Sequence, residues 1–395
     1  MNIRQLFFQH IAQTSDAPIA LEPVKAEGIY IYDSSGKKYI DAISGFSVAN
    51  IGHSHPKVVQ ATQEQIASYM HLIVYGEFIE QPQVAYAKAL VDLLPQNLNS
   101  VYFTNSGAEA VEGAMKLAKR VTNRSKIICF NKSYHGSTQG ALSLIGDEYW
   151  RQAFRPLLPD IYHYNFNSKE AIDAIDDKTA CVILEPIQAE AGIIKPNIEW
   201  LQQIREKCNK HCSLLIFDEI QSGFGRTGSL WAFEQFNVVP DILLLGKALG
   251  GGMPLGAFIS DKKMMDTLSY NPVLGHITTF GGHPVSCTSG KAALEVLLKN
   301  NWINTVKEKE QLLKEYLVHT KIKQLNIVGL WCAIELESFE ITKQIAKTCI
   351  ENGVITDWFL FADNCLRIAP PLCISNEELQ TMCNIILESI DKAYN

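Results

Sequence analysis

Two kinds of hydrophobic pattern alternate along the chain between about Pro56 and Ile277. Longer stretches with apolar residues at helical spacing predict amphipathic helices, and short continuous apolar runs predict strands buried on both faces. The predicted helices are residues 57–71, 83–94 and 108–121. The predicted strands are residues 100–104, 126–130, 180–186, 213–219, 241–246 and 255–260. This alternation predicts an α/β fold in which helices flank a mostly parallel central sheet.

The two ends of the chain have a different pattern. Residues 28–33 and 37–42 are two short strand-like pieces separated by a Ser-Ser-Gly turn, which predicts a hairpin. After residue 280, two long helices precede predicted strands at 326–336 and 365–370 and a closing helix. We therefore expect a smaller α+β domain built from both chain ends. The expected division is an N-terminal segment of the small domain at residues 1–50, the large domain at 51–279, and the rest of the small domain at 280–395.

Composition and charge narrow the functional classes. The 395 residues are 47% hydrophobic and 19% charged, which is typical of a globular protein. The formal net charge is −7, so no basic surface for nucleic acid or for an anionic membrane is expected. The first residues show no signal-peptide cleavage pattern, and no apolar run approaches the roughly 18 residues that a membrane span needs.

Cysteine usage points to a reducing compartment. Ten cysteines lack the regular spacing of a disulfide framework, which predicts free thiols and a cytoplasmic location. Cys208, His211 and Cys212 are close in sequence, but they lie in a helix-like stretch without a second ligand pair nearby. We therefore expect no metal.

Lys247 is the first candidate for chemistry. It follows a predicted strand that ends at Gly246, and Gly250-Gly251-Gly252 then allow a sharp turn. Burial in a cleft at such a place lowers the pKa of an amine and makes it a nucleophile. A surface lysine beside a flexible turn explains this segment alone equally well.

Asp218 is the second candidate. Together with Glu219 it closes a predicted strand that is otherwise apolar. A buried carboxylate needs a charged partner or several hydrogen bonds, and a protonated pyridine nitrogen is such a partner. The alternative is a strand-end acid that caps the next turn.

Two further loops follow predicted strands. Asn105-Ser106-Gly107-Ala108 leads into a helix, whose N-terminal N–H groups and dipole favour an anion such as phosphate. An ordinary helix cap is the alternative. Tyr134 and His135 follow another strand, where an aromatic ring can stack on a planar cofactor or simply belong to the core.

Residues 223–228, Gly-Phe-Gly-Arg-Thr-Gly, match the dinucleotide pattern GxGxxG. In a dinucleotide site the first glycine directly follows the strand, and the third opens a helix. Here four residues, 219–222, intervene, and the sequence that follows is a weak helix former. An NAD-dependent oxidoreductase is therefore the less favoured alternative.

Taken together and in this order, these segments resemble the class-III (subgroup II) pyridoxal-phosphate-dependent aminotransferases, which include acetylornithine and ornithine aminotransferases. The likeness extends over nearly the whole chain and implies a fold-type I transferase. The segments that carry it are residues 28–56, FTNSGAEA (103–110), YHG (134–136), EPIQAEAG (185–192), DEIQSGFGRTG (218–228), GKALGGGMP (246–254), TFGGHP (279–284) and LRIAPPL (366–372).

The resemblance implies a role for each matching residue. Lys247 would form a Schiff base with pyridoxal 5′-phosphate and then move a proton on the substrate, while Asp218 would keep the pyridine nitrogen protonated. The other implied cofactor-binding residues are Ser106, Gly107 and Ala108 at the phosphate, Tyr134 and His135 at the ring, Gln221 at the phenolic oxygen and Thr279 at the phosphate of the neighbouring subunit. The last role implies a homodimer with shared active sites.

The same resemblance implies how substrates are recognised. Arg367 would bind the α-carboxylate of glutamate or 2-oxoglutarate, and Glu190 would pair with that arginine when the other substrate is present. Phe46, Ser47 and Tyr75 are further candidates for the substrate pocket. The implied reaction is a ping-pong transamination from an ω-amino donor, similar to acetylornithine or ornithine, to 2-oxoglutarate.

The chain departs from the family at two places. Members of this family commonly carry an arginine after the YHG-type His-Gly pair that helps to bind a substrate carboxylate, and here the residue is Ser137. Arg151 is one residue that could replace it. The usual GGNP segment also reads GGHP, with His283 in place of asparagine. The donor therefore stays open, and a same-fold aminomutase or other pyridoxal-phosphate enzyme is the alternative reaction.

Overall fold

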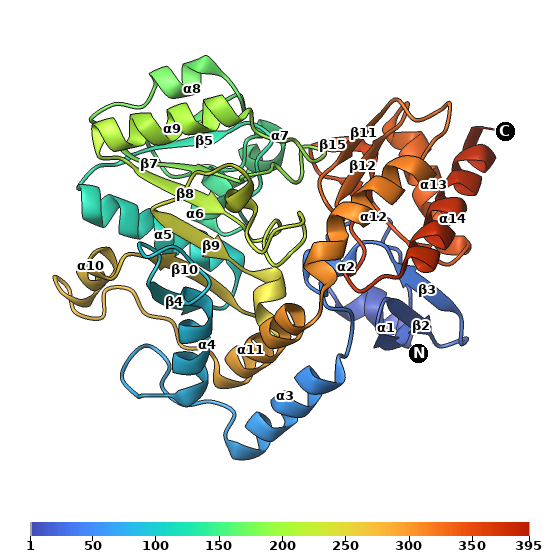
Figure 1. Cartoon of the computed structure of the whole chain (residues 1–395), viewed down its shortest axis with the longest axis horizontal. Helices are drawn as coiled ribbons and strands as arrows, with labels where there is room; N and C mark the ends of the chain where they lie inside the picture. The colour runs from blue at the N-terminus through green and yellow to red at the C-terminus, as the bar shows by residue number, and fades with distance from the viewer. Residues whose placement is uncertain (1, 395) are drawn as a thin grey trace.

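The computed structural model describes residues 2–394, and its central element is a seven-stranded sheet (Figure 1). In sheet order the strands are β4 (Ser100–Thr104), β10 (Gly256–Ser260), β9 (Ile242–Leu245), β8 (Leu214–Asp218), β7 (Thr179–Leu184), β5 (Lys126–Phe130) and β6 (Ile161–Tyr164). The pairs β9-β8, β8-β7, β7-β5 and β5-β6 are parallel, whereas β10 is antiparallel to both of its neighbours. The predicted α/β fold with a mostly parallel sheet is confirmed, although the sequence did not predict the antiparallel insertion of β10.

Successive residues of each central strand enter different cores, because side chains alternate across a sheet. In β8, Ile216 packs into the core beneath α5 (Gly107–Thr122), whereas Leu215 and Phe217 belong to the core on the other face. That second face is covered by α4 (Gln81–Val91), α9 (Ile198–His211) and α11 (Pro284–Lys299). The other helices of this part are α3 (Pro56–Ser68), α6 (Gln139–Ser143), α7 (Glu148–Arg151), α8 (Lys169–Asp173) and α10 (Lys262–Met265), with short 3₁₀ turns at Gln152–Phe154, Ala232–Gln235, Lys247–Gly250 and Asp266–Ser269.

Both chain ends meet in the remaining part of the molecule (Figure 1). The predicted N-terminal hairpin is present as β2 and β3, and β13 from the C-terminal part pairs in parallel with β3. The first small sheet is β1 (Pro23–Glu27), β2 (Tyr30–Asp33), β3 (Lys38–Asp41) and β13 (Val354–Ile355). The second is β11 (Gln324–Ile327), β12 (Cys332–Glu335), β15 (Ala362–Ile368) and β14 (Trp358–Phe359). The domain boundaries at residues 50 and 279 stay a prediction.

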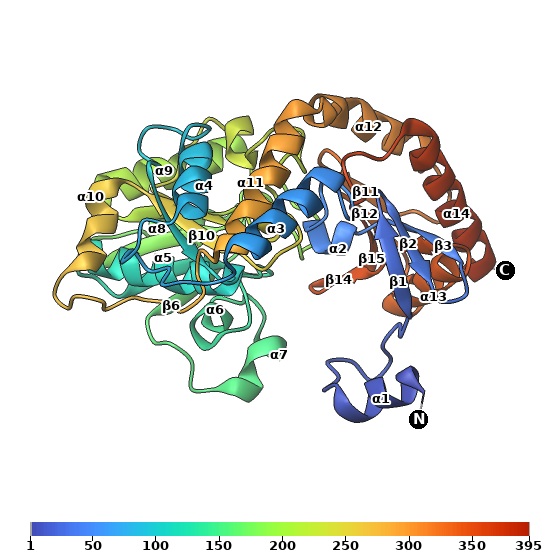
Figure 2. The same cartoon turned by 90° about the horizontal axis from the view of Figure 1, so that it is seen from below.

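Helices complete this smaller part. They are α2 (Ser44–Ser47), α12 (Trp302–Tyr316), α13 (Phe339–Glu351) and α14 (Asn376–Tyr394). The N-terminal helix α1 (Ile3–His10) has no buried residue, and it lies below the small sheets in the view of Figure 2. No helix within residues 2–394 is long and apolar enough to cross a membrane.

One predicted strand is wrong. Residues 326–336 were expected as a single strand, but the chain reverses between β11 and β12, which pair with each other antiparallel. Gly329 makes the reversal with φ +63°, and a Cβ atom there would lie 2.6 Å from the carbonyl oxygen of Arg226. Apolar content alone could not reveal this turn, because residues on both sides of Gly329 are buried.

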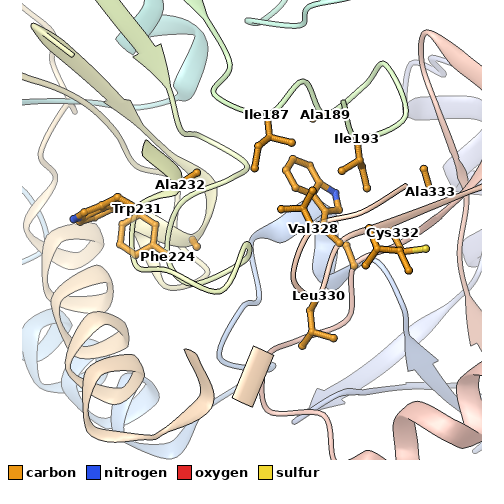
Figure 3. Packing of buried hydrophobic residues seen from close by; sticks show 14 of the residues in the cluster. Ile187, Ala189, Ile193, Phe224, Trp231, Ala232, Val328, Leu330, Cys332 and Ala333 are labelled. Carbon is orange, nitrogen blue, oxygen red and sulfur yellow. The ribbon is translucent and has the colours of Figure 1, made fainter. Parts of the chain in front are cut away.

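A continuous hydrophobic cluster joins the two parts (Figure 3). Ile187 and Ile193, from the loop after β7, lie in it with Val328 and Cys332 of the small part. This shared core holds the loop after β7 against the small part.

Candidate functional site

A cavity of about 410 Å³ opens at the carboxyl ends of the parallel strands. Because these ends lie at one edge of the sheet, residues far apart in sequence meet there. Its walls combine acidic, basic, aromatic and small residues. They are Gly107, Ala108, Tyr134, His135, Gly136, Ser137, Thr138, Glu185, Ile187, Asp218, Ile220, Gln221, Ser222 and Lys247.

Lys247 follows β9 and begins a short 3₁₀ turn. Its φ of +49° is left-handed, an unfavourable conformation for a residue with a Cβ that is typical of functional positions. The side chain faces the cavity, and burial lowers the pKa of its amine to about 8, with the charge of Arg367 acting in the same direction and Glu190 opposing it. Near neutral pH, the neutral and nucleophilic form of Lys247 is therefore a minority, but a far larger one than for an ordinary lysine.

Asp218 ends β8 and pairs with His135. The Nδ1 atom of His135 lies 2.7 Å from Oδ2 of Asp218, and both side chains are buried. Oδ1 of Asp218 accepts a hydrogen bond from the backbone of Ile220. Burial alone would lower the pKa of His135, but the bond and charge of Asp218 outweigh it and raise the pKa. The pair therefore places a carboxylate, bound to an imidazole, in the cavity wall.

Glu185 is a site residue that the sequence reasoning missed. It follows β7, is buried, and accepts hydrogen bonds from the backbone of Tyr134 and Ala189. Burial raises its pKa to about 7, against the opposing charge of His135. The available signal was its place at the end of an apolar strand, the same pattern that singled out Asp218.

The start of α5 forms one wall. Ser106 is the N-cap, and its hydroxyl accepts the backbone N–H of Glu109, as in an ordinary cap. Ser106 itself is not among the lining residues, whereas Gly107 and Ala108 are. A Cβ atom on Gly107 would come 2.7 Å from Ile220, and one on Gly136 would come 2.6 Å from the Ala108 side chain. The wall is therefore packed so closely that only small residues fit beside the helix N-terminus.

Three buried polar atoms of cavity-lining residues lack a partner among residues 2–394: Nε2 of His135, Oε1 of Gln221 and Oγ of Ser222. The amide nitrogen of Gln221 donates to Glu190. Together with the amine of Lys247 and the carboxylate of Asp218, these groups fit a flat, polar, anionic cofactor such as pyridoxal 5′-phosphate.

Arg367 and Glu190 form a buried pair beside the cavity. Two guanidinium nitrogens of Arg367 donate to the two carboxylate oxygens of Glu190, each at 2.9 Å. Its Nε donates to Asp357 at 2.9 Å, a partner that the sequence reasoning missed. Burial alone would raise the pKa of Glu190, but Arg367 lowers it to about 2. Burial raises the pKa of Asp357, the second acid bound to Arg367, to about 6.

Some of the other predicted site residues lie at the cavity, and others do not. Tyr134 lines the cavity, and its hydroxyl lies 3.1 Å from that of Ser137. The ring of Phe46 lies 5.2 Å from the Arg367 guanidinium carbon. Three predicted residues, namely Ser47, Tyr75 and Thr279, do not line the cavity of their own chain.

Arg151 does not replace the missing arginine. Its guanidinium is bound to Glu148, to His163 and to the carbonyl groups of Ser143 and Ile145, and it does not line the cavity.

The GxGxxG segment is a structural element rather than a dinucleotide site. No α-helix follows it, since only a 3₁₀ turn begins at Ala232. Arg226, inside the segment, is fully buried and donates to Ser44, Asn50, Leu330 and Pro370, which come from both ends of the chain. The segment therefore anchors the small part to the large part, and the nicotinamide-dependent alternative is wrong.

Metal binding finds no support in the geometry. Within residues 2–394, no group of three or more His, Cys, Asp or Glu side chains is arranged to hold a metal ion. His211, from the Cys-rich stretch, pairs with Asp177.

The chain is similar to known proteins along nearly its whole length. The aminotransferase class-III family model matches residues 11–390. The chain is 37% identical over 384 residues to the acetylornithine aminotransferase of Methanopyrus kandleri, covering 96% of each protein. It is 34% identical to the [LysW]-aminoadipate semialdehyde/glutamate semialdehyde transaminase of Sulfolobus acidocaldarius, covering 94% of this chain and 95% of that protein. Among solved structures, the ornithine aminotransferase of Toxoplasma gondii superposes with a TM-score of 0.90 at 29% identity, covering 99% of this chain and 93% of that one.

Proposed function

Because the chain belongs to the class-III aminotransferase family, we propose that it uses pyridoxal 5′-phosphate to transfer an amino group from an ω-amino donor to 2-oxoglutarate. The observation that carries the proposal is the meeting of Lys247, the Asp218–His135 pair and the start of α5 around one cavity. When bound, pyridoxal phosphate condenses with amines and withdraws electrons from the carbon that bears the amino group.

The residues of this chain supply the rest of the chemistry. The N–H groups at the start of α5 bind the phosphate through hydrogen bonds and the helix dipole. Asp218, oriented by His135, stabilises a proton on the pyridine nitrogen. Lys247 Nζ, whose pKa is about 8, can accept a proton and return it near neutral pH.

Arg367 and Glu190 allow one pocket to take two substrates. With Glu190 paired to it, Arg367 has four of its five N–H groups bonded to protein acceptors. When Glu190 moves aside, the fork of Arg367 can bind the carboxylate of 2-oxoglutarate or glutamate. A two-substrate transamination uses both states, whereas an aminomutase needs no external 2-oxo acid.

A spectroscopic experiment tests the function. Purified protein reconstituted with pyridoxal 5′-phosphate should be yellow, and glutamate should bleach the visible band. Adding 2-oxoglutarate should restore the band. Borohydride should fix the cofactor to the peptide that contains Lys247. A band that neither glutamate nor any amine alters would contradict the proposal.

We also place the active sites in a homodimer. Large apolar side chains are exposed in two segments, residues 70–84 and 270–280, with Ile79 96% and Val273 72% exposed. Contiguous exposed apolar surface of this kind marks protein interfaces. Thr279 lies in the second segment, which supports its role in the site of the neighbouring subunit.

Subunit mixing tests this arrangement. Lys247→Ala and Thr279→Asp variants should each be inactive alone. In a mixed dimer, one site combines the native Lys247 of one subunit with the native Thr279 of the other, so activity should return. No return despite demonstrated exchange of subunits would refute the shared site.

A cytoplasmic location stays a prediction, supported by cysteines that are all unpaired within residues 2–394.

A further inference from the structure

We propose that the amino donor is an aminoalkyl compound whose far end is uncharged, and not an amino acid with a carboxylate at that end. This inference rests on the function proposed above and names the substrate class of the same site. It comes from the charges and side chains around the mouth of the cavity, beyond Tyr134.

The mouth offers no free cation to a carboxylate. Of the described residues that line the cavity, Lys247 is the one lysine or arginine, and its amine is the reacting group. The exposed lining residues, which mark the mouth, are Ser137 and Thr138, and both are uncharged. A carboxylate held there would meet hydroxyl groups but no cation, which disfavours it relative to an uncharged group.

Arg367 is already balanced by acids. Every one of its guanidinium nitrogens donates to a protein acceptor, namely Glu190, Asp357 or the carbonyl of Trp358. Two carboxylates therefore face one guanidinium. A donor carboxylate could reach Arg367 only by displacing Glu190, which is the state used for the 2-oxo acid.

The wall beside the mouth is apolar. Tyr134 packs in a cluster with Leu142, Ile145 and Phe361, and Phe361 comes from the β14–β15 hairpin of the small part. The Trp150 ring of α7 meets Phe361 edge-on, with ring centres 6.1 Å apart. Tyr134 is the member of this cluster that lines the cavity, so its ring, held in place by the others, can cover an alkyl or acylated tail and remove it from water.

If a second subunit docked through the two exposed apolar segments, these segments would bring no positive charge to the mouth. The sequence contains no lysine or arginine from residue 58 to 87, and none from residue 264 to 290. The segments themselves therefore add no basic side chain beyond histidine, and the two basic residues that lie against the second segment, Lys116 and Arg120, already donate to its carbonyl groups.

Matched pairs of amines test the proposal. N-acetylputrescine and N-acetylornithine differ only in the α-carboxylate, and butylamine and 5-aminopentanoate likewise differ only by one carboxylate. Bleaching of the cofactor band should be at least about 10-fold more efficient, as kcat/KM, for the member without the carboxylate, since one charge-assisted contact is worth about that factor. Calorimetric titration of the turnover-deficient Lys247→Ala holoenzyme should show the same order of dissociation constants.

A gain-of-function variant makes the test independent of any loss of folding. Ser137 lines the mouth and is exposed, so an arginine there can reach a bound carboxylate. Ser137→Arg should raise the preference for N-acetylornithine over N-acetylputrescine by about 10-fold or more, whereas Ser137→Gln, of similar polarity but without charge, should not.

The outcomes separate the two proposals. If N-acetylornithine or 5-aminopentanoate reacts as well as its partner, the donor class is wrong. It is equally wrong if glutamate bleaches the band but neither carboxylate-free amine does. If glutamate and all amines leave the band unchanged, the proposed function itself fails.

Discussion

Arg367 and Glu190 lie 177 residues apart in sequence and form a two-pronged ion pair, with both nitrogen–oxygen distances at 2.9 Å. The pair is buried, and the ring of Phe359 covers the guanidinium at 4.3 Å. Such a pair is costly to break on one side, because the remaining charge is left without a partner. It therefore suits a switch in which an incoming carboxylate takes the place of Glu190.

Arg367→Ala should weaken 2-oxoglutarate far more than the amino donor. Loss of a charge-assisted, two-pronged contact is worth about 1.5–3 kcal/mol, which raises the KM for 2-oxoglutarate roughly 10- to 150-fold. Steady-state kinetics with each substrate varied in turn would measure this. Arg155→Ala, at an exposed pair with Glu148, is the matched control. An equal effect on both substrates would remove Arg367 from carboxylate recognition.

Asp218→Asn should abolish most activity while the fold is kept. The neutral amide cannot stabilise a proton on the pyridine nitrogen, and losses of about 100-fold or more in kcat are usual for such preorganised electrostatic groups. Single-turnover kinetics and circular dichroism would measure the two effects. Asp241→Asn is the control, because Asp241 pairs with Arg205 outside the cavity. Near-normal turnover of Asp218→Asn would exclude the assigned role.

Lys247 should titrate far below an ordinary lysine in the cofactor-free protein. Burial lowers its pKa to about 8, so the neutral amine is the minority form below pH 8 and the majority form above it. The rate of its reductive methylation should therefore rise with pH and be half-maximal near pH 8, compared with about 10.4 for a free lysine. Peptide mass spectrometry would follow Lys247, with the exposed Lys169 as an internal reference. Identical profiles for the two lysines would contradict the burial argument.

Arg226→Met should destabilise the whole chain. Methionine fills part of the volume but leaves the buried carbonyl groups of Leu330 and Pro370 without donors. Each such group costs about 1–3 kcal/mol, so we expect a loss of about 3 kcal/mol or more in the free energy of unfolding. Urea unfolding would measure it. Arg155→Met, at a surface pair, should change stability by about 1 kcal/mol or less. A loss as small for Arg226→Met would mean that the segment is not an anchor.

The candidate site residues that could be predicted are polar residues at the ends of apolar strands. Lys247 and Asp218 each follow or end a short apolar strand, and parallel strands bring such ends to one edge of the sheet. Glu185 follows the same rule after β7, yet the sequence reasoning did not apply it there. The helix after residue 107 was also predictable, because its apolar spacing and its cap are local features.

Other features depend on contacts that no local pattern reports. The pairing of β13 with β3 joins residues more than 300 positions apart, and the bond between Asp357 and Arg367 depends on how β15 lies beside the loop before it. The reversal at Gly329 was missed because Ile327 and Val328 before it and Leu330 to Ile334 after it are buried and form one apolar run in the sequence. Arg226 matched a nucleotide-binding pattern and proved to be a buried anchor.

The sequence by itself therefore determined the α/β class and the family, and it singled out Lys247 and Asp218 as candidates, since these depend on local periodicity and on short segments in a set order. Only the tertiary structure decided what surrounds them. It showed that Arg151 is bound elsewhere, that Ser137 stands in an uncharged mouth and that Arg367 is balanced by two acids. The physical reason is that charge balance and burial are sums over neighbours in space, and folding brings those neighbours from every part of the chain.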